Sequence, residues 1–268
     1  MDELKAPRPL AVITGASSGI GYHLALCAAD HGYDLVLAAD TPMDDVHEAC
    51  DKAGAQVQTV LCDLASNGGV RQLLEVIGDR EVDALMANAG HGLGGCFLDQ
   101  DWEAILHVIN TNITGTLYLV HQLARRMRSR AKGLGHGHIL ITGSVAGFQP
   151  GSFHAVYNAS KAFIDSFAAA LRDELKDTRM SVTCLMPGAT DTEFFDRADL
   201  LGTRMGEMPK MDAAKVARAG FDAMLKGDAD VVTGLANKAQ VAMSKLMPSQ
   251  AVAAMHRKLA EPHSTSKE

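Results

Sequence analysis

A phenol and an ammonium stand four residues apart in the stretch VYNASKAF, residues 156–163. In a helix, positions i and i+4 share one face, so Tyr157 and Lys161 would project to the same side. A phenol with an ordinary pKa of about 10 is a poor base at neutral pH, and a nearby ammonium lowers that pKa by favouring the phenolate. The spacing therefore predicts a general acid/base, Tyr157, that is tuned by Lys161.

A serine lies 13 residues before this tyrosine, directly after the apolar run GHILITG of residues 137–143. At the end of a strand, the hydroxyl of Ser144 could donate a hydrogen bond to a substrate oxygen and stabilise the charge that develops there. A serine in such a place is more often only a turn or cap residue. The catalytic interpretation depends on whether the fold brings Ser144 to Tyr157.

A loop of small residues, TGASSGIG at residues 14–21, lies between the apolar run LAVI and a predicted helix that begins near Ile20. Small residues let the backbone approach a pyrophosphate, whose charge then meets the free N–H groups at the start of the helix. A plain strand-to-helix turn is the alternative. The strand before the loop and the helix after it favour nucleotide binding.

The elements that must position these residues are short apolar runs that alternate with longer segments of helical period. Strands without polar alternation are typical of a sheet that is covered on both faces. The pattern predicts an α/β fold with a doubly wound parallel sheet of about seven strands and helices on both faces. The runs are LAVITG, YDLVLAA, AQVQTVLCD, VDALMANAG, GHILITGS, SVTCLMPG and DADVVTG.

Composition narrows the class of partner. The chain has 268 residues, 47% apolar content and a formal net charge of −7, which favours one globular domain over residues 1–268 and argues against nucleic acid or an anionic membrane surface. The first ten residues lack the apolar region of a signal peptide, and no apolar run approaches membrane-spanning length. Five cysteines without a CxxC pair indicate reduced thiols, so a cytoplasmic protein is expected.

Two histidines in the segment GHGH, His136 and His138, raise the question of a metal site. They precede a predicted strand, and no third ligand is near them in the sequence, whereas zinc sites use at least three protein ligands. We therefore expect no metal.

Further segments complete a set that resembles the short-chain dehydrogenase/reductase family. The loop spacing TGxxxGxG differs from the GxGxxG of the common dinucleotide fold and is similar to that of this family. The resemblance covers about residues 8–234, and one departure is Ala87, where many members carry asparagine. The other matching segments are DL at 63–64, ANAG at 87–90, NITG at 112–115, GSVAG at 143–147, YNASK at 157–161 and PGATDT at 187–192.

The resemblance implies a Rossmann-like fold and a catalytic set of Asn112, Ser144, Tyr157 and Lys161. Ser144 would orient the substrate, Tyr157 would give or take the alcohol proton, and Asn112 would hold a water in a proton relay to Lys161. Asn110, two residues earlier, should not reach the site. The expected cofactor-binding residues are Gly15, Ser17, Ser18, Gly19, Ile20, Gly21, Asp40, Asp63, Leu64, Asn88, Ala89, Gly90, Tyr157, Lys161, Pro187, Gly188, Thr190 and Thr192.

Tyrosine can supply a proton but cannot accept a hydride, so a nicotinamide cofactor must be the redox partner. Asp40 ends the second predicted strand, 19 residues after the last loop glycine, where a carboxylate can bond a ribose 2′-hydroxyl and repel a 2′-phosphate. In NAD-using relatives the acid often stands one place earlier, at Ala39 here, and NADP-using relatives often carry arginine at the position of Asp40. No Lys or Arg occurs from Pro9 to Asp51, so NAD is favoured and NADP stays the alternative.

The predicted activity is hydride transfer between the cofactor and a secondary alcohol or ketone, and a regulatory protein that binds the nucleotide without turnover is the alternative from another class. Relatives place a mobile substrate lid at the position of residues 191–211. The apolar lid residues, which favour a hydrophobic substrate, are Phe194, Phe195, Leu200, Leu201, Met205 and Met208. Other candidates for the pocket wall are His91, Leu93, Phe148, Gln149 and His154.

A helical extension follows at residues 235–260 and is rich in Met and Ala. It could cover the pocket or pair with another subunit, and ordinary packing is the plainer interpretation. Because relatives commonly assemble through helix faces, a homodimer or homotetramer is expected.

Overall fold

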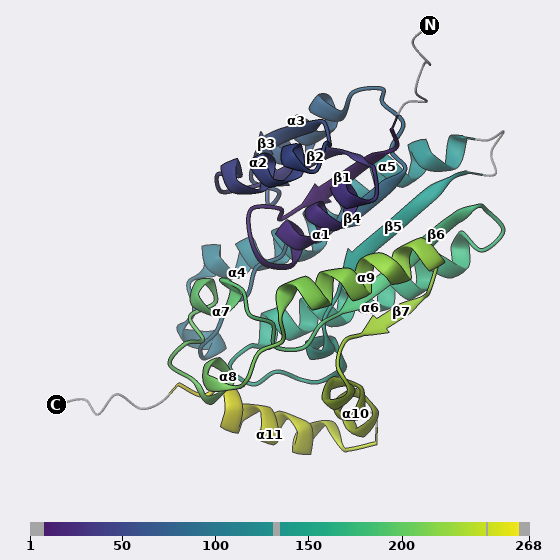
Figure 1. Cartoon of the computed structure of the whole chain (residues 1–268). Helices are drawn as coiled ribbons and strands as arrows, with labels where there is room; N and C mark the ends of the chain where they lie inside the picture. The colour runs from purple at the N-terminus through teal and green to yellow at the C-terminus, as the bar shows by residue number, and fades with distance from the viewer. Residues whose placement is uncertain (1–7, 131–134, 245, 263–268) are drawn as a thin grey trace, which may run out of the picture.

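A computed structural model describes residues 8–130, 135–244 and 246–262 (Figure 1), so the expectation about the first seven residues lies outside it. In chain order its helices and strands are β1 (Leu10–Thr14), α1 (Gly19–Asp30), β2 (Asp34–Ala39), α2 (Asp44–Lys52), β3 (Val57–Leu61), α3 (Asn67–Ile77), β4 (Ala84–Ala87), η1 (Phe97–Asp99), α4 (Trp102–Ile109), η2 (Asn110–Gly115), α5 (Thr116–Ser129), β5 (Gly137–Thr142), η4 (Val145–Phe148), α6 (Ala155–Glu174), β6 (Met180–Met186), α7 (Phe194–Arg197), α8 (Arg204–Glu207), α9 (Ala213–Lys226), β7 (Asp230–Val232), α10 (Leu235–Ser244) and α11 (Ser249–Ala260).

The seven strands form one parallel sheet in the order β3-β2-β1-β4-β5-β6-β7. The register is continuous across its centre, where Ile13 of β1 pairs with Leu37 of β2 and with Met86 of β4. The seven apolar runs of the sequence are these seven strands. The prediction of an α/β fold with a doubly wound, Rossmann-like sheet is therefore confirmed.

Helices cover both faces of the sheet, because successive side chains of a buried strand point to opposite sides. In β1, Val12 lies in the cluster formed with α3, α5 and α6, whereas Ile13 lies in the cluster formed with α1, α2 and α9. Both side chains are fully buried. Two apolar layers of this kind explain why the strands read as continuous apolar runs.

The direction of the chain reverses at the centre of the sheet. From β1 the chain builds β2 and β3 on one side, and it then crosses to β4, β5, β6 and β7 on the other. The loops that leave the carboxyl ends of β1 and β4 therefore diverge, which opens a crevice at that edge. In Figure 1 the strand arrowheads point toward the end of the molecule where α7, α8, α10 and α11 gather.

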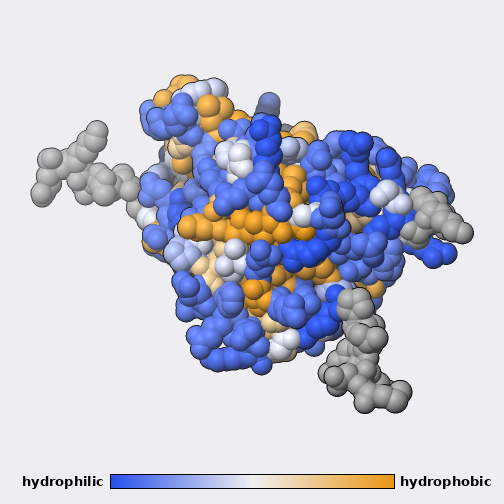
Figure 2. Space-filling model, turned by 90° about the horizontal axis from the view of Figure 1, so that it is seen from above, coloured by the Kyte–Doolittle hydropathy of each residue, from blue (hydrophilic) through white to orange (hydrophobic). Residues whose placement is uncertain are grey.

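The surface is mainly polar, with apolar residues gathered across the middle of the face that is seen from above (Figure 2). Within the described ranges, the exposed large apolar side chains include Leu98, Trp102 and Leu246. None of the described helices has the length and apolar character that crossing a membrane requires.

Candidate active site

A cavity of about 560 Å³ lies at the carboxyl ends of the strands. Its wall combines segments that are far apart in the sequence, including the loop after β1, the ends of β2 and β4, the start of α6 and the lid. The predicted site residues that line it are Gly15, Ser17, Ser18, Gly19, Ile20, Asp40, Asp63, Leu64, Asn88, Ala89, Gly90, Ser144, Tyr157, Lys161, Pro187, Gly188, Thr190 and Thr192. Gly21 and Asn112 lie behind the wall.

Gly21 does not line the cavity, but its lack of a side chain lets α1 lie against the loop after β1. A Cβ at this position would collide with the backbone carbonyl of Gly15 and with the Asn88 side chain, so only glycine lets α1 pack so close to the loop. The cap residue Ser18 makes no side-chain hydrogen bond to the first turn of α1. The N–H groups of that turn are thus left for a ligand, since Ser18, Gly19 and Ile20 all line the cavity.

Asn88 joins three strand ends beneath the cavity. Its Nδ2 donates to the carbonyl of Thr14 at 3.1 Å, and its Oδ1 accepts a hydrogen bond from Oγ1 of Thr142 at 3.0 Å. The backbone amides of Asn88 and Ala89 both donate to Oγ1 of Thr14 at 3.0 Å. The loops after β1, β4 and β5 are therefore fixed relative to one another.

One end of the cavity is open to water and carries charges of both signs. Asp40, whose side chain is 48% exposed, lies 4.0 Å from Nη1 of Arg197 on α7. The same guanidinium lies 2.6 Å from Oε2 of Glu193. The sequence offered no cation near Asp40, but the fold brings one from a segment more than 150 residues away.

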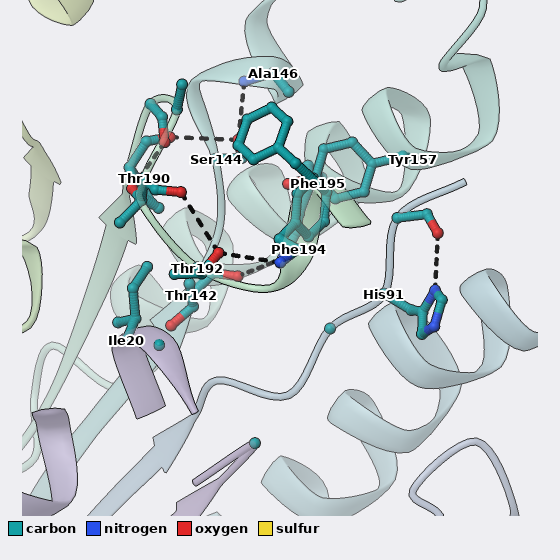
Figure 3. Close-up of a pocket in the computed structure, with 18 of the residues that line it drawn as sticks. Ile20, His91, Thr142, Ser144, Ala146, Tyr157, Thr190, Thr192, Phe194 and Phe195 are labelled. Carbon is teal, nitrogen blue, oxygen red and sulfur yellow. Dashed lines mark hydrogen bonds between the residues drawn. The ribbon is translucent and has the colours of Figure 1, made fainter. Parts of the chain in front are cut away.

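The other end of the cavity is closed by aromatic rings. The ring of Tyr157 stacks on His154, with centroids 4.5 Å apart, and its other neighbour is Phe194 at 5.0 Å. Figure 3 shows the rings of Tyr157, Phe194 and Phe195 close together, with Ser144 beside them. Tyr157 is 9% exposed, so this end excludes most water.

Ser144 is held by the backbone around it. Its Oγ accepts a hydrogen bond from the amide of Ala146 at 3.1 Å and donates to the carbonyl of Pro187 at 3.4 Å. It therefore acts as the cap residue of η4, which was the plain alternative for a serine at a strand end. The same hydroxyl lies near enough to the Tyr157 phenol to lower its pKa.

Lys161 is 5% exposed, and its Nζ donates to the carbonyl of Thr142 at 2.8 Å. The ammonium lies 5.9 Å from the centroid of the Tyr157 ring. Burial lowers the pKa of Lys161, and the nearby carboxylate of Asp165 opposes that effect. A cation is therefore fixed beneath Tyr157 at the buried end of the cavity.

The expected low pKa of Tyr157 is wrong for the chain on its own. Burial raises the pKa of Tyr157 from about 10 to about 12; the Ser144 hydroxyl lowers it and the Asp165 carboxylate raises it. The physical reason is desolvation, which disfavours the phenolate more than its polar neighbours favour it. The Tyr157 side chain is therefore a neutral phenol in this state.

Asn112 is buried in η2, a wide helical turn between α4 and α5. Its Nδ2 donates to the carbonyl of His91 and to Oγ of Ser160, both at 2.9 Å, and its Oδ1 accepts the amide of His91 at 2.7 Å. Its side chain thus fixes the turn after β4 and does not reach the cavity surface. Asn110 lines a neighbouring hollow and not this cavity.

Part of the expected substrate wall is present. Of the lid residues, Phe194, Phe195, Met205 and Met208 line the cavity. Leu200 packs beneath them against Phe195, whereas Leu201 is 53% exposed.

The other wall candidates divide in the same way. His91 and His154 line the cavity, and Leu93 lines the neighbouring hollow. Phe148 and Gln149 were expected in the wall but do not line the cavity, because η4 turns Phe148 toward the core cluster of α5 and α6.

The carboxyl-terminal helices supply wall residues that the sequence did not predict. Asn237 and Gln240 of α10 and His256 and Leu259 of α11 line the cavity. The ring of His256 is held by a hydrogen bond between Nδ1 and the carbonyl of Ser152 at 2.9 Å. The segment had a helical period, but nothing in the sequence indicated where the helices would dock.

Of the two histidines of GHGH, His136 is exposed and His138 is half-buried. His138 makes a hydrogen bond through Nδ1 to Oγ of Ser181 at 2.8 Å, and burial lowers its pKa. Across residues 8–130, 135–244 and 246–262, no group of three His, Cys, Asp or Glu side chains could hold a metal ion.

Comparison with known proteins adds an independent observation. The profile of the family described as short chain dehydrogenase matches residues 9–200. An uncharacterized oxidoreductase of Myxococcus xanthus is 30% identical over 258 residues, which cover 93% of this chain and 96% of that protein. A short-chain dehydrogenase from Sphingobium yanoikuyae in complex with NADPH superposes with a TM-score of 0.77 at 26% identity, over 97% of this chain and 100% of the other. One from Burkholderia phymatum in complex with NAD gives 0.75 at 26% identity, over 96% and 98%.

Proposed function

The chain belongs to the short-chain dehydrogenase/reductase family and is an NAD(P)-dependent oxidoreductase, and we propose that it interconverts a hydrophobic secondary alcohol and the corresponding ketone with NAD as the preferred cofactor. One observation carries this proposal. A single cavity joins a helix start with free N–H groups, a carboxylate at the end of β2, and a buried Tyr157 beside Ser144 and Lys161. These groups suit a dinucleotide whose pyrophosphate lies at the start of α1.

A bound nicotinamide supplies the hydride donor or acceptor for this reaction. The residues of the chain do the rest. In ketone reduction, Ser144 would donate a hydrogen bond to the substrate oxygen, and the neutral phenol of Tyr157 would deliver the proton to that oxygen. In alcohol oxidation, Tyr157 would take the proton back. A phenol with a raised pKa suits ketone reduction without further activation, since it is fully protonated at neutral pH and can donate its proton.

Two further roles belong to the same proposal. Lys161 would place its ammonium beneath the phenol and favour the phenolate that forms when Tyr157 gives up its proton. Asn112 would act behind the wall, where it fixes the turn at Gly90 and His91 next to Lys161. A proton relay from Lys161 through a water at Asn112 is the path by which the phenol would be recharged.

The substrate class follows from the wall beyond Tyr157. Phe194, Phe195, Met205 and Met208 from the lid and Leu259 from α11 line this part of the cavity. Apolar side chains gain free energy when an apolar ligand displaces water from them. The segments 191–211 and 235–260 would thus hold a hydrophobic alcohol or ketone.

The preference for NAD rests on Asp40, whose carboxylate can accept the ribose 2′-hydroxyl and repels a 2′-phosphate. Arg197 is the specific observation that favours the alternative, NADP. Its guanidinium lies at the same end of the cavity and could leave Asp40 to bind a phosphate. Arg197 contacts two carboxylates, Asp40 and Glu193, so the three side chains together keep a negative charge, which is why we place NAD first.

We also propose a homodimer or homotetramer in the cytoplasm. The four buried and one exposed free cysteines among the described residues suit a reducing compartment. Size-exclusion chromatography with light scattering would measure the assembly.

A panel of secondary alcohols and ketones, assayed with each cofactor at 340 nm, tests the function. We expect oxidation of hydrophobic secondary alcohols, with activity that rises with apolar bulk beside the carbinol carbon. Binding of NADH without turnover of any panel member would favour a nucleotide-sensing protein and would refute the proposed enzyme.

A further inference from the structure

One buried carboxylate, Asp165, stands out among the described residues because no other Asp or Glu of that part of the chain is buried. Asp165 is 9% exposed and follows Lys161 by one turn of α6. Tyr157, Lys161 and Asp165 are spaced i, i+4 and i+8, so they form one stripe of the helix. The phenol and the ammonium of the candidate site are continued by a carboxylate that lines no part of the cavity.

The carboxylate contacts the Ser144 turn directly. Its Oδ1 accepts the backbone amide of Ser144 at 3.2 Å and the thiol of Cys184 at 3.6 Å. Its Oδ2 is buried and has no hydrogen-bond partner among the described residues. A buried, unpaired oxygen costs free energy, so the fold retains Asp165 at the expense of stability.

Two glycines make room for this group. A Cβ at Gly143 would collide with Oδ1 of Asp165, and a Cβ at Gly147 would collide with Oδ2. The carboxylate is thus wedged between the residues that flank Ser144 in the segment GSVAG. Larger residues at 143 or 147 would separate α6 from the turn that presents Ser144.

Burial has the largest influence on the pKa of Asp165, and groups on α6, in the Ser144 turn, on β6 and on β7 modify it. On its own helix, the Lys161 ammonium lowers the pKa of Asp165, as do the Ser144 amide and the Cys184 thiol. Asp230 of β7, which pairs in register with Cys184, raises it. Burial outweighs all of these, and the pKa of Asp165 rises from 3.8 to about 6. The carboxylate is therefore ionised at neutral pH and protonated in mild acid.

We propose that Asp165 is a positioning residue whose ionised carboxylate fixes the Ser144 turn and holds the buried ammonium of Lys161 in its charged form. Asp165 would act through these two residues and would not touch substrate or cofactor. Its effect on turnover rests on the proposed function, whereas its contact with Ser144 does not.

The test compares Asp165→Asn with a matched control, Asp173→Asn. Asp173 is an exposed carboxylate farther along the same helix and forms a surface ion pair with Lys176. The asparagine oxygen can still accept the Ser144 amide, but its charge is gone. With an alcohol that the wild type oxidises, kcat/KM of wild type and control should fall as the pH drops through about 6. In Asp165→Asn this acid limb should be missing and the plateau should be more than twofold lower, because the charge that favours the Lys161 ammonium is lost.

A second measurement does not need turnover. The Ser144 amide resonance should titrate near pH 6 in ¹H–¹⁵N spectra of the wild type, because its acceptor gains a proton there. The surface variant Asp230→Asn should move that titration to lower pH, since it removes a negative charge near Asp165. It also keeps the test valid if Asp165→Asn does not fold.

The possible outcomes test the role of Asp165 and the proposed enzyme activity separately. A Ser144 amide that does not titrate, or an Asp165→Asn enzyme that keeps the wild-type acid limb and a rate within twofold, would overturn the proposal. A wild type without any turnover would refute the proposed enzyme, while the amide titration would still decide whether Asp165 ionises against Ser144.

Discussion

Each end of the cavity has a carboxylate and a cation near it, but the two charges are exposed to water at one end and buried at the other. At the open end, Asp40 and Arg197 are 48% and 36% exposed and lie 4.0 Å apart. At the closed end Lys161 lines the wall and Asp165 lies behind it; they are 5% and 9% exposed, and each is held by a backbone group at or just after the end of β5. Water screens the Asp40–Arg197 pair and leaves it free to rearrange, whereas Asp165 and Lys161 are each fixed by burial and by a backbone hydrogen bond.

This difference in solvent exposure indicates different roles for the two ends. An exposed ion pair contributes about 0 to 1 kcal/mol, so a ligand phosphate or hydroxyl can compete with it. At the closed end burial dominates: it raises the pKa of Tyr157 to about 12 and that of Asp165 to about 6, against the smaller influence of their polar neighbours. We infer that the open end selects the cofactor and that the closed end performs proton transfer.

The largest effect should come from the closed end. Tyr157→Phe removes one hydroxyl and keeps the ring that stacks on His154. We expect turnover of the alcohol to fall by about 10²- to 10⁴-fold, the usual cost of losing a general acid/base. Tyr118→Phe, on α5, is the matched control and should keep wild-type rates. Near-native turnover in Tyr157→Phe would mean that another group moves the proton.

The pH dependence of stability should report the buried carboxylate. Because the folded-state pKa of Asp165 is raised from 3.8 to about 6, the folded chain binds a proton that the unfolded chain has released. Relative to Asp165→Asn, the wild type should therefore lose stability as the pH rises from about 4 to about 6, by roughly 3 kcal/mol, and should lose no more above that range. Urea unfolding of both proteins at several pH values measures the difference. A constant difference would contradict the burial of an ionised carboxylate.

The cofactor preference should change at the open end. The wild type should bind NADH more tightly than NADPH by about tenfold, which corresponds to about 1.4 kcal/mol. Asp40→Arg should narrow or reverse the preference, since a guanidinium can bond the 2′-phosphate. Fluorescence titrations with both cofactors measure this ratio. A tenfold preference of the wild type for NADPH would transfer the phosphate-binding role to Arg197.

The smallest effect should come from Arg197→Ala. The guanidinium is partly exposed and shared between Asp40 and Glu193, so its loss should change the free energy of unfolding by less than about 1 kcal/mol. NADH affinity should stay within about twofold. A large loss of NADPH affinity, with NADH unaffected, would show that the open end binds phosphate through the lid.

Local patterns predicted the fold well, and the residues expected in the glycine loop, except Gly21, line the cavity. Strands that are buried on both faces must be apolar throughout, and seven such runs could be recognised from the sequence. The glycine loop could be recognised because backbone approach to a helix start needs small residues at fixed spacing. The Tyr157 and Lys161 pair needed only the period of one helix.

The remaining features depend on contacts that sequence spacing does not encode. Arg197 reaches Asp40 only because α7 folds across the cavity, and His256 reaches the wall only because α11 docks beside Ser152. The pKa of Tyr157 was predicted in the wrong direction because the sequence gives the neighbouring charge but not the degree of burial. Asp165 was on the predicted face of α6, but its contact with Ser144 required the packing of α6 against β5 and η4.

NADH binding by the Tyr157→Phe variant tests the division of work between the two ends most directly. The measurement is a fluorescence titration of the same preparation whose turnover has been assayed, with the wild type beside it. If the ends are separate, the dissociation constant for NADH should remain within about twofold of the wild-type value while turnover is lost, because the change removes no group from the open end. Loss of NADH binding in parallel with turnover would show that the phenol holds the cofactor and would contradict the assignment of proton transfer to Tyr157.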